Sequence, residues 1–357
     1  MKVLIDRGNA PSRGGIGVFS ANIIRAVKTF CPDSVNIEDS GISRGPTGLR
    51  PLYRLIYLSR LYRLRQKGFH TAEVVHFTNY YVPPRLKNVS FVSTIHDIDP
   101  IAIPEVHTRR YVYYFRYILE HTLKRTHAFE THTEAIKNEV IERFNVDSDS
   151  VRVVGDGLSP EFITAAKAAQ KHFPDQPSLL FVGQLNRKKN VAWLTNAVVS
   201  GVLTGALPKL TLVLAGSPGF GSEEVLNEVR ASAGIVRWQP SPSLDQLVAL
   251  YRSSSMLILP SLREGFGRPL LEAMYCSVPI VASRIPSSLE VAGDAALYFA
   301  LHDRDELYHS IRETLSGRYH ANQQAVAQQR LSNYSWRRLA PCFVELYRES
   351  QVACNDK

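Results

Sequence analysis

The sequence predicts an α/β fold built from two doubly wound domains. Short apolar runs that read as buried strands alternate along the chain with helical patterns, which is typical of parallel sheets covered by helices. At 357 residues the chain has the length of two domains of ~150–200 residues each. We therefore expect an N-terminal Rossmann-like domain over residues 1–170 and a C-terminal Rossmann-like domain over residues 171–334. A closing helix over residues 335–357 is expected to pack back toward the first domain.

The composition narrows the class of partner. A formal net charge of +9 favours an anionic partner such as nucleic acid, anionic lipid or a phosphorylated substrate. We do not expect nucleic acid, because no helix-turn-helix, zinc-finger or RNA-binding aromatic motif stands out. Four dispersed cysteines without a Cys-x-x-Cys pair indicate neither a zinc site nor a disulfide framework. Because no run approaches ~20 apolar residues, we expect a cytoplasmic protein, at most associated with the inner face of the plasma membrane.

The N-terminal segment reads as the opening strand and helix of the first domain. Residues 2–6 predict the strand, and a helical pattern covers residues 18–29. Gly14, Gly15 and Gly17 stand at the entrance of this helix. They could expose backbone N–H groups to a phosphate, or they could simply permit a tight turn.

Residues 49–67 differ in composition from the rest of the chain. Apolar and aromatic residues recur at helical spacing, and every charged residue in the segment is basic. This pattern is expected of a helix lying on an anionic membrane surface. A core-facing helix with a solvated basic back would show the same pattern.

A histidine stands at the end of a predicted strand of the first domain. Residues 89–95 read as a parallel strand, which places His96 at its carboxyl end. The ring could hydrogen-bond a sugar hydroxyl or a phosphate, although a lone histidine is more often structural. The next predicted strand covers residues 126–131, and Thr131-x-x-Glu134 matches a helix capping box. We assign Glu134 a structural role.

Three consecutive cations follow the first strand of the second domain. Residues 179–183 read as that strand, and Arg187, Lys188 and Lys189 stand at the turn to the next helix. Such a run is often a solvated surface. At the carboxyl end of a parallel strand it could instead clamp a diphosphate.

A polar loop bracketed by two carboxylates follows a later strand of the same domain. The apolar run over residues 256–260 predicts the strand, and Glu264 and Glu272 lie before and after the segment Gly-Phe-Gly-Arg-Pro at residues 265–269. Proline suits the first turn of a helix, whose free N–H groups would face an anion. Because ionised carboxylates only accept hydrogen bonds, the hydroxyl groups of a sugar or ribose are their natural partners.

Together these motifs resemble the family 4 retaining glycosyltransferases, and they are similar to bacterial mannosyl- and rhamnosyl-type transferases of surface polysaccharide assembly. The Glu-x7-Glu spacing around Gly-Phe-Gly-x-Pro carries most of the resemblance. Further matches are Gly-Gly-Ile-Gly at residues 14–17, the six-residue spacing from Gly183 to Lys189, and the segment Thr-Ile-His-Asp-Ile at residues 94–98. The resemblance implies the GT-B architecture, in which two Rossmann-like domains face a central cleft. It also implies that residues 1–170 bind the acceptor and that residues 171–334 bind the nucleotide-sugar donor.

The resemblance also implies roles for the matching residues. His96, Glu264 and Lys189 are expected to be catalytic, with Lys189 stabilising the departing diphosphate. The residues expected to bind the donor are Gly14, Gly15, Gly17, Arg187, Lys188, Lys189, Gly265, Phe266, Gly267, Arg268 and Glu272. We expect no metal and no other cofactor, because no Asp-x-Asp metal motif of the metal-dependent transferases is evident at the predicted clamp. The letters Asp-Ile-Asp at residues 97–99 fall in the other domain.

Three places depart from the pattern of the resembling family. Many members have an arginine directly after the glycine or directly before the lysine, where this chain has Gln184 and Lys188. The role of that arginine would pass to Arg187 or Lys188. Ser277 replaces a usual glycine, and Glu130 replaces a usual apolar residue.

These observations predict a metal-independent retaining transferase. It would move a hexose or deoxyhexose from a nucleotide-diphosphate sugar to a glycan or lipid-linked oligosaccharide, in the assembly of O-antigen, capsule or exopolysaccharide. One alternative is a catalytically inactive, membrane-associated scaffold with the same fold. Another is a dinucleotide-dependent oxidoreductase, but its Gly-x-Gly-x-x-Gly fingerprint with an acidic residue ~20 positions later is absent.

Overall fold

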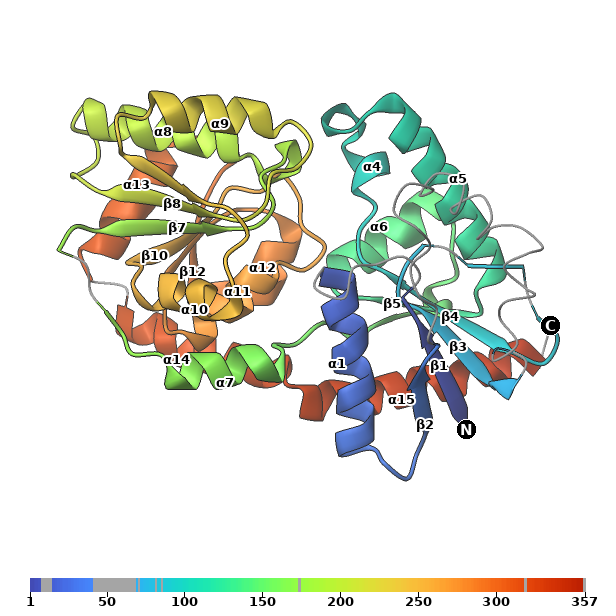
Figure 1. The fold of residues 1–357 in the computed structure, drawn as a ribbon. Coiled ribbons are helices and arrows are strands. Elements are labelled where there is room, and N and C mark those ends of the chain that lie inside the picture. The colour runs from blue at the N-terminus through green and yellow to red at the C-terminus, as the bar shows by residue number, and fades with distance from the viewer. Residues whose placement is uncertain are drawn as a thin grey trace. The chain divides into compact units, whose positions relative to one another are not determined.

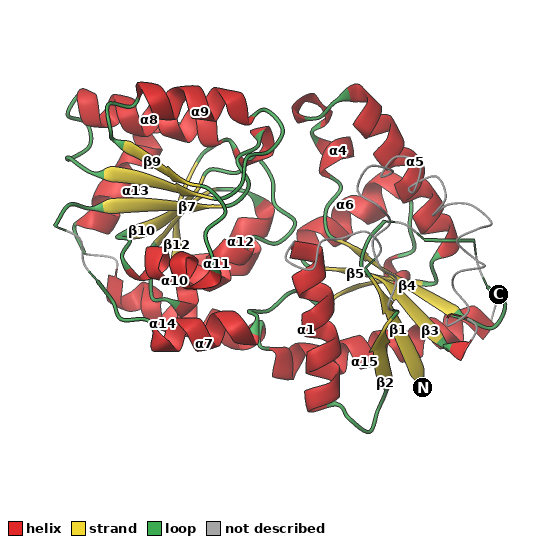
Figure 2. Cartoon of the chain, in the orientation of Figure 1, coloured by secondary structure: helices red, strands yellow, loops and turns green. Residues whose placement is uncertain are grey.

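The chain folds into two compact units, each built around a parallel sheet (Figure 1). The computed structural model describes residues 1–7, 15–40, 69, 71–80, 82–84, 86–172, 175–317 and 320–355. Unit 1 comprises Met1–Gly157 and Tyr334–Lys357, and unit 2 comprises Leu158–Asn333. Helices cover both faces of each sheet (Figure 2). Gly14 and the basic segment 49–67 lie outside the described residues.

Unit 1 contains a six-stranded parallel sheet with the order β2-β1-β3-β4-β5-β6. Its strands are β1 (Lys2–Asp6), β2 (Asn36–Asp39), β3 (Val74–Phe77), β4 (Ser90–Ile95), β5 (Ala128–Thr131) and β6 (Val151–Val153). Every residue of β3, β4 and β5 is buried, as expected for central strands covered on both faces. All pairings between neighbouring strands are parallel, so the carboxyl ends of β3, β4 and β5 meet at one edge.

Helices from opposite ends of the chain cover one face of this sheet. The helix α1 (Gly15–Phe30) packs against α15 (Trp336–Asn355), and both bury apolar side chains in one core with Val3, Val74 and Val92. Residues of α5 (Arg109–Arg125) and α6 (Glu134–Phe144) build a separate core with Ile95 and Phe129 on the other face. The described part of unit 1 also contains the short helices α4 (Asp99–Ala102), η3 (Pro104–Val106) and η4 (Ser148–Ser150).

Three boundaries differ from those predicted from the sequence. The chain passes into unit 2 after Gly157, not after residue 170, because α7 (Pro160–Ala168) places Phe162 against Tyr251 and Tyr275 of unit 2. The first helix begins at Gly15, so Gly15 and Gly17 lie in its first turn and not in the preceding loop. The cap of α6 is Thr133, whose side chain accepts a hydrogen bond from the N–H of Ile136. The predicted capping box starting at Thr131 is therefore wrong.

Unit 2 contains a second six-stranded parallel sheet, with the order β12-β11-β10-β7-β8-β9. Its strands are β7 (Ser178–Val182), β8 (Thr211–Ala215), β9 (Val236–Gln239), β10 (Met256–Leu259), β11 (Ile280–Ser283) and β12 (Ala296–Phe299). The helices are α8 (Val191–Leu203), α9 (Ser222–Ala231), α10 (Leu244–Arg252), α11 (Arg268–Tyr275), α12 (Pro286–Ala292), α13 (Arg304–Leu315) and α14 (His320–Asn333), with short turns η5 (Arg187–Lys189) and η6 (Gly293–Ala295). Because β7 and β10 are neighbours, the loops that follow them leave the same edge of the sheet.

None of the helices in the described part of the chain is long and apolar enough to cross a membrane.

The ends of β7 and β8 approach so closely that a glycine is required. The N–H of Gly183 donates to the carbonyl of Ala215, and Gly216 follows directly. A Cβ atom added to Gly216 would lie 1.9 Å from the carbonyl oxygen of Gly183. No side-chain rearrangement can relieve this collision, since both atoms are fixed to the backbone.

We expect Gly216→Ala to lower the free energy of unfolding by about 3 kcal/mol or more, because the backbone must shift at the sheet edge. Gly205→Ala is the matched control. Gly205 also has a positive φ, of 79°, but a Cβ there meets no atom within 4 Å. The control should cost only about 1 kcal/mol of backbone strain. Urea unfolding of both variants measures the difference between the two losses of stability. Equal midpoints would show that the close approach of Gly216 to the Gly183 carbonyl does not determine the cost of the substitution.

Candidate active site

The cationic loop after β7 and the polar loop after β10 are bonded to each other. The turn η5 begins after Asn186, whose side chain accepts a hydrogen bond from the N–H of Lys189 at 3.1 Å. The N–H of Leu262 donates to the carbonyl of Lys188 at 2.9 Å. The order of the sheet thus brings together two motifs that lie far apart in the sequence.

Lys189 and Glu264 form a largely buried ion pair between these loops. The ammonium of Lys189 lies 2.5 Å from Oε1 of Glu264, and the hydroxyl of Ser261 donates to the same oxygen at 2.6 Å. Only 8% of Glu264 is exposed. Burial would raise the pKa of this carboxyl, but the charges of Lys189 and Lys188 and the two hydrogen bonds outweigh burial and lower it. Glu264 is therefore a carboxylate at neutral pH.

The second carboxylate is anchored by a buried tyrosine. The hydroxyl of Tyr251, in α10, donates to Oε2 of Glu272 at 2.7 Å. Burial, and then the charge of Glu272, raise the pKa of Tyr251 well above its usual value, so the hydroxyl stays a donor. Glu272 lies in α11, which begins after Gly267, a residue with a φ of 91° that favours glycine. Tyr251 was not predicted as a site residue.

The remaining loop residues support α11. Gly265, Phe266 and Gly267 are buried, and the ring of Phe266 is only 5% exposed. Arg268 is the first residue of the helix, and Pro269 occupies its first turn as predicted from the sequence.

Arg187 has a different environment from the two lysines that follow it. Its guanidinium lies over the ring of Phe220, 5.4 Å from the ring centroid. It also borders a cavity of about 390 Å³ whose lining includes Trp193, Glu224 and Glu228. The structure therefore places Lys188 and Lys189 at Glu264, and Arg187 against Phe220.

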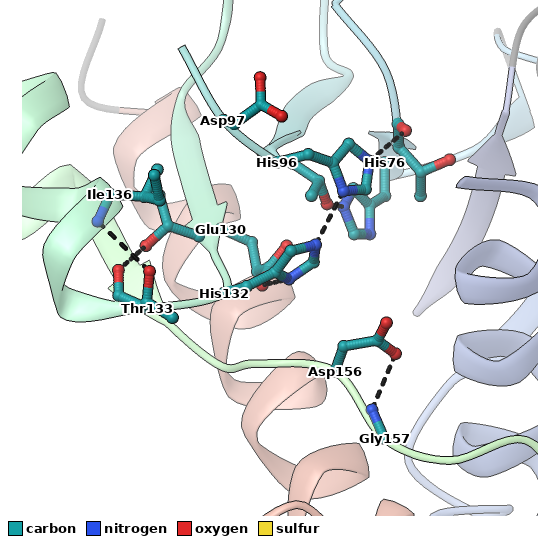
Figure 3. Close-up of polar contacts among 12 residues, drawn as sticks. His76, His96, Asp97, Glu130, His132, Thr133, Ile136, Asp156 and Gly157 are labelled. Carbon is teal, nitrogen blue, oxygen red and sulfur yellow. Dashed lines mark hydrogen bonds and ion pairs between the residues drawn. The ribbon is translucent and has the colours of Figure 1, made fainter. Parts of the chain in front are cut away.

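In unit 1, His96 belongs to a chain of hydrogen bonds at the carboxyl ends of β4 and β5 (Figure 3). Its Nε2 atom lies 3.0 Å from the carbonyl of Thr78, and its Nδ1 atom lies 2.7 Å from Nε2 of His132. Nδ1 of His132 in turn lies 3.1 Å from Oε1 of Glu130. Burial, and then the nearby His132, lower the pKa of His96 to about 4, so the ring is neutral at physiological pH.

The sequence reasoning missed His132. The signal was the pairing of β4 with β5, in which Ile95 is opposite Thr131. The residues that follow, His96 and His132, are then expected to be neighbours.

Other predicted groups of unit 1 have structural contacts. The N–H of Asp97 donates to the hydroxyl of Tyr80, and that hydroxyl donates to the carbonyl of Asp97. Asp99 is 1% exposed at the start of α4. Gly15 and Gly17 lie in the first turn of α1. Among the described residues, no group of three or more His, Cys, Asp or Glu side chains is arranged to hold a metal ion.

Two family models match consecutive parts of the chain. The model described as Glycosyltransferase Family 4 matches residues 19–162, and the model described as Glycosyl transferases group 1 matches residues 162–331. The O-antigen chain mannosyltransferase B of Escherichia coli is 28% identical over 335 residues, which cover 89% of this chain and 87% of that protein. The D-inositol 3-phosphate glycosyltransferase of Saccharomonospora viridis is 29% identical over 238 residues, which cover 62% of this chain and 55% of that protein.

Solved structures show the same fold at low sequence identity. Sucrose-phosphate synthase from Thermosynechococcus elongatus aligns with a TM-score of 0.75 and 15% identity, and the alignment covers 97% of this chain and 98% of that chain. HepE of Anabaena, in complex with UDP-glucose, aligns with a TM-score of 0.68 and 16% identity, covering 97% of this chain and 98% of that chain.

We expect Lys189→Met to lower the free energy of unfolding by about 3 kcal/mol, because it leaves the Glu264 carboxylate buried without its cation. Adding Glu264→Gln should recover most of this loss, since the amide carries no charge to bury. The control is Arg284→Met. Arg284 pairs with Glu306 at 3.2 Å, but both side chains are more than 40% exposed, so the cost should stay below about 1 kcal/mol. Denaturant unfolding of these three variants and of Glu264→Gln alone tests this, and additive losses at Lys189 and Glu264 would contradict the coupling.

Proposed function

Because the chain belongs to the family 4 glycosyltransferases and has their GT-B fold, we propose that it transfers a hexose or deoxyhexose from a nucleotide-diphosphate sugar to a glycan or lipid-linked acceptor. The observation that carries this proposal is the grouping of Lys188, Lys189 and Glu264 at the carboxyl edge of the unit 2 sheet. That edge is where open α/β sheets bind their ligands.

In this proposal unit 2 binds the donor. An ammonium has three N–H donors, so the Lys189 ammonium can bond phosphate oxygens as well as Glu264. Lys188 adds a second positive charge, and the buried turn from Gly265 to Gly267 leads into the N-terminus of α11. Glu272, oriented by Tyr251, would accept hydrogen bonds from the ribose hydroxyls. Arg268 would add to the positive lining of the donor site, and Arg187 could join it only by leaving its contact with Phe220.

The reaction itself needs no protein nucleophile. In a front-face substitution, the acceptor oxygen bonds to the anomeric carbon as the bond from that carbon to the phosphate oxygen breaks. The acceptor proton passes to the leaving phosphate oxygen, and the products are the new glycoside and a nucleoside diphosphate. The fixed charge of Lys189 would stabilise the departing diphosphate electrostatically, and the Glu264 carboxylate would stabilise positive charge that develops on the sugar. We propose that these side chains act without a metal ion.

His96 would contact the reacting sugar from unit 1. Because its Nε2–H donates to the carbonyl of Thr78, a sugar hydroxyl would have to accept from the same N–H or take the place of that carbonyl. Gly15 and Gly17 would let the first turn of α1 approach the donor phosphates, together with Gly14.

We place the reaction in surface polysaccharide assembly at the inner face of the plasma membrane. The support is the similarity to an O-antigen chain mannosyltransferase over most of both chains. The basic segment 49–67 would hold the enzyme on anionic lipid near a lipid-linked acceptor.

The first test is a panel of UDP-, GDP- and dTDP-sugars, with release of nucleoside diphosphate and thermal shift as readouts. We expect one base to stabilise the protein and its sugar nucleotide to be turned over when a lipid-linked or oligosaccharide acceptor is added. If none of the donors raises the melting temperature or is consumed, the proposed activity is wrong. Stabilisation without turnover would favour the inactive scaffold.

A second prediction separates the sugar from the nucleotide. We expect His96→Ala to lower kcat by about 100-fold, while the affinity for nucleoside diphosphate stays within about twofold, because His96 is assigned to the sugar. His309→Ala, at an exposed histidine in α13, is the control. A native kcat in His96→Ala would remove this residue from the reaction centre.

A further inference from the structure

A histidine and a carboxylate lie behind His96 and are joined to it by hydrogen bonds. In the β4–β5 pairing, Thr94 is opposite Glu130 and Ile95 is opposite Thr131. Side chains two residues apart on a strand point to the same face, so Glu130 and His132 project together. Figure 3 shows the resulting row, with the His132 ring between Glu130 and His96.

The direction of each hydrogen bond in this row can be worked out from the groups present. A carbonyl only accepts, so the Nε2 atom of His96 must carry the hydrogen in its bond to Thr78. The neutral ring then has a lone pair on Nδ1, and Nε2 of His132 must donate to it. Along the third bond, either Glu130 donates to His132 or His132 donates to Glu130. In both arrangements His132 and Glu130 share one proton, and the pair as a whole is neutral.

The His132–Glu130 pair lies in a buried and partly apolar environment. Glu130 is fully buried and His132 is 5% exposed. The Phe19 ring of α1 packs edge-on against both histidines, with ring centroids 5.5 Å from His96 and 4.7 Å from His132. The Oε2 atom of Glu130 is buried without a hydrogen-bond partner. Burying a polar atom without a partner costs free energy, which an apolar side chain of the same size would avoid. The presence of a carboxyl at position 130 is therefore better explained by its bond to His132.

Other titratable groups border this row. From β3, His76 bonds the hydroxyl of Tyr347 at 3.0 Å and that of Thr94 at 2.8 Å, and burial is the main cause that lowers its pKa to about 3. Tyr347 comes from α15 and keeps its proton, because burial and the charge of Glu130 raise its pKa. Asp97 follows β4, and Asp156, whose carboxylate accepts from the N–H of Gly157, follows β6. His76 and Tyr347 are thus held neutral.

We propose that Glu130 and His132 are positioning residues of the transfer reaction, which hold His96 in the tautomer with its hydrogen on Nε2. Without the donor at His132, the His96 ring can take its hydrogen on Nδ1. Its Nε2 lone pair would then face the carbonyl of Thr78, and the ring would have to turn. The role of this row in catalysis rests on the function proposed above, whereas the tautomer itself does not.

The test uses full-length protein and ring-nitrogen NMR of His96, assigned by comparison with His96→Gln. Glu130→Leu removes the partner of Nδ1 of His132, so the one hydrogen of the neutral His132 ring is no longer confined to Nε2 and can move to Nδ1. We expect the Nδ1–H tautomer of His96 to appear and kcat to fall about tenfold or more with little change in KM. Glu130→Gln is the conservative rescue, because its amide can donate to Nδ1 of His132. It should keep the native tautomer and a kcat within about threefold of native.

Two further variants keep the result interpretable. Glu142→Leu makes the same substitution at an exposed position of α6 and should change neither readout. If Glu130→Leu does not fold, His132→Leu can be used instead. It removes the ring that donates to Nδ1 of His96, and we expect the same change of tautomer. A native tautomer in the folded leucine variants would overturn the proposal, as would a Glu130→Gln protein that loses the tautomer as fully as Glu130→Leu. Absence of any transferase activity would count against the proposed function, while the NMR readout would still decide the positioning role.

Discussion

In unit 2, one bond between the Lys189 ammonium and the Glu264 carboxylate joins the loops that follow two neighbouring strands. Each partner makes the burial of the other tolerable, since an unpaired charge in this position would be costly. The pair therefore fixes loop geometry and local charge together. Lys188, whose carbonyl accepts from Leu262, adds its charge to the same place. An anionic ligand at this edge would meet cations whose orientation is already set, so little reorganisation is needed on binding.

Unit 1 contributes polar groups of a different kind. His76 and His96 are held neutral by burial, and hydrogen bonds join His96 through His132 to Glu130. Such groups can orient hydroxyls without adding net charge. The two units thus divide the chemistry: fixed positive charge in unit 2 and neutral, oriented hydrogen-bonding groups in unit 1.

Most strands and the main helices could be predicted from the sequence because their apolar periodicity is strong, as in the fully buried β10. The meeting of Lys189 and Glu264 could not be derived from periodicity, since it depends on β7 lying beside β10. The family resemblance assigned both residues to one site but did not predict their ion pair. His132 was missed because Thr131 was read as a helix cap, which would place His132 in the first turn of a helix. The cap is Thr133, so β5 extends to Thr131 and His132 stands at the carboxyl end of the strand.

Ser277 shows a departure from the family pattern that the structure explains. It has a φ of 54°, in the left-handed region where glycine is favoured. The serine accepts this backbone strain between α11 and β11, away from Lys189 and Glu264. The sequence also could not decide whether Arg187 or Lys188 takes the role of the family's arginine. That depends on tertiary contacts, because stacking on Phe220 separates Arg187 from the two lysines.

We propose that Lys189 binds the donor diphosphate. This can be measured by calorimetric titration of UDP and GDP into native protein, Lys189→Met and Lys209→Met, because Lys209 is an exposed lysine of the same unit. We expect Lys189→Met to weaken binding of the preferred diphosphate about tenfold or more, corresponding to at least ~1.4 kcal/mol, while Lys209→Met binds as the native protein does. Native affinity in a folded Lys189→Met protein would contradict it.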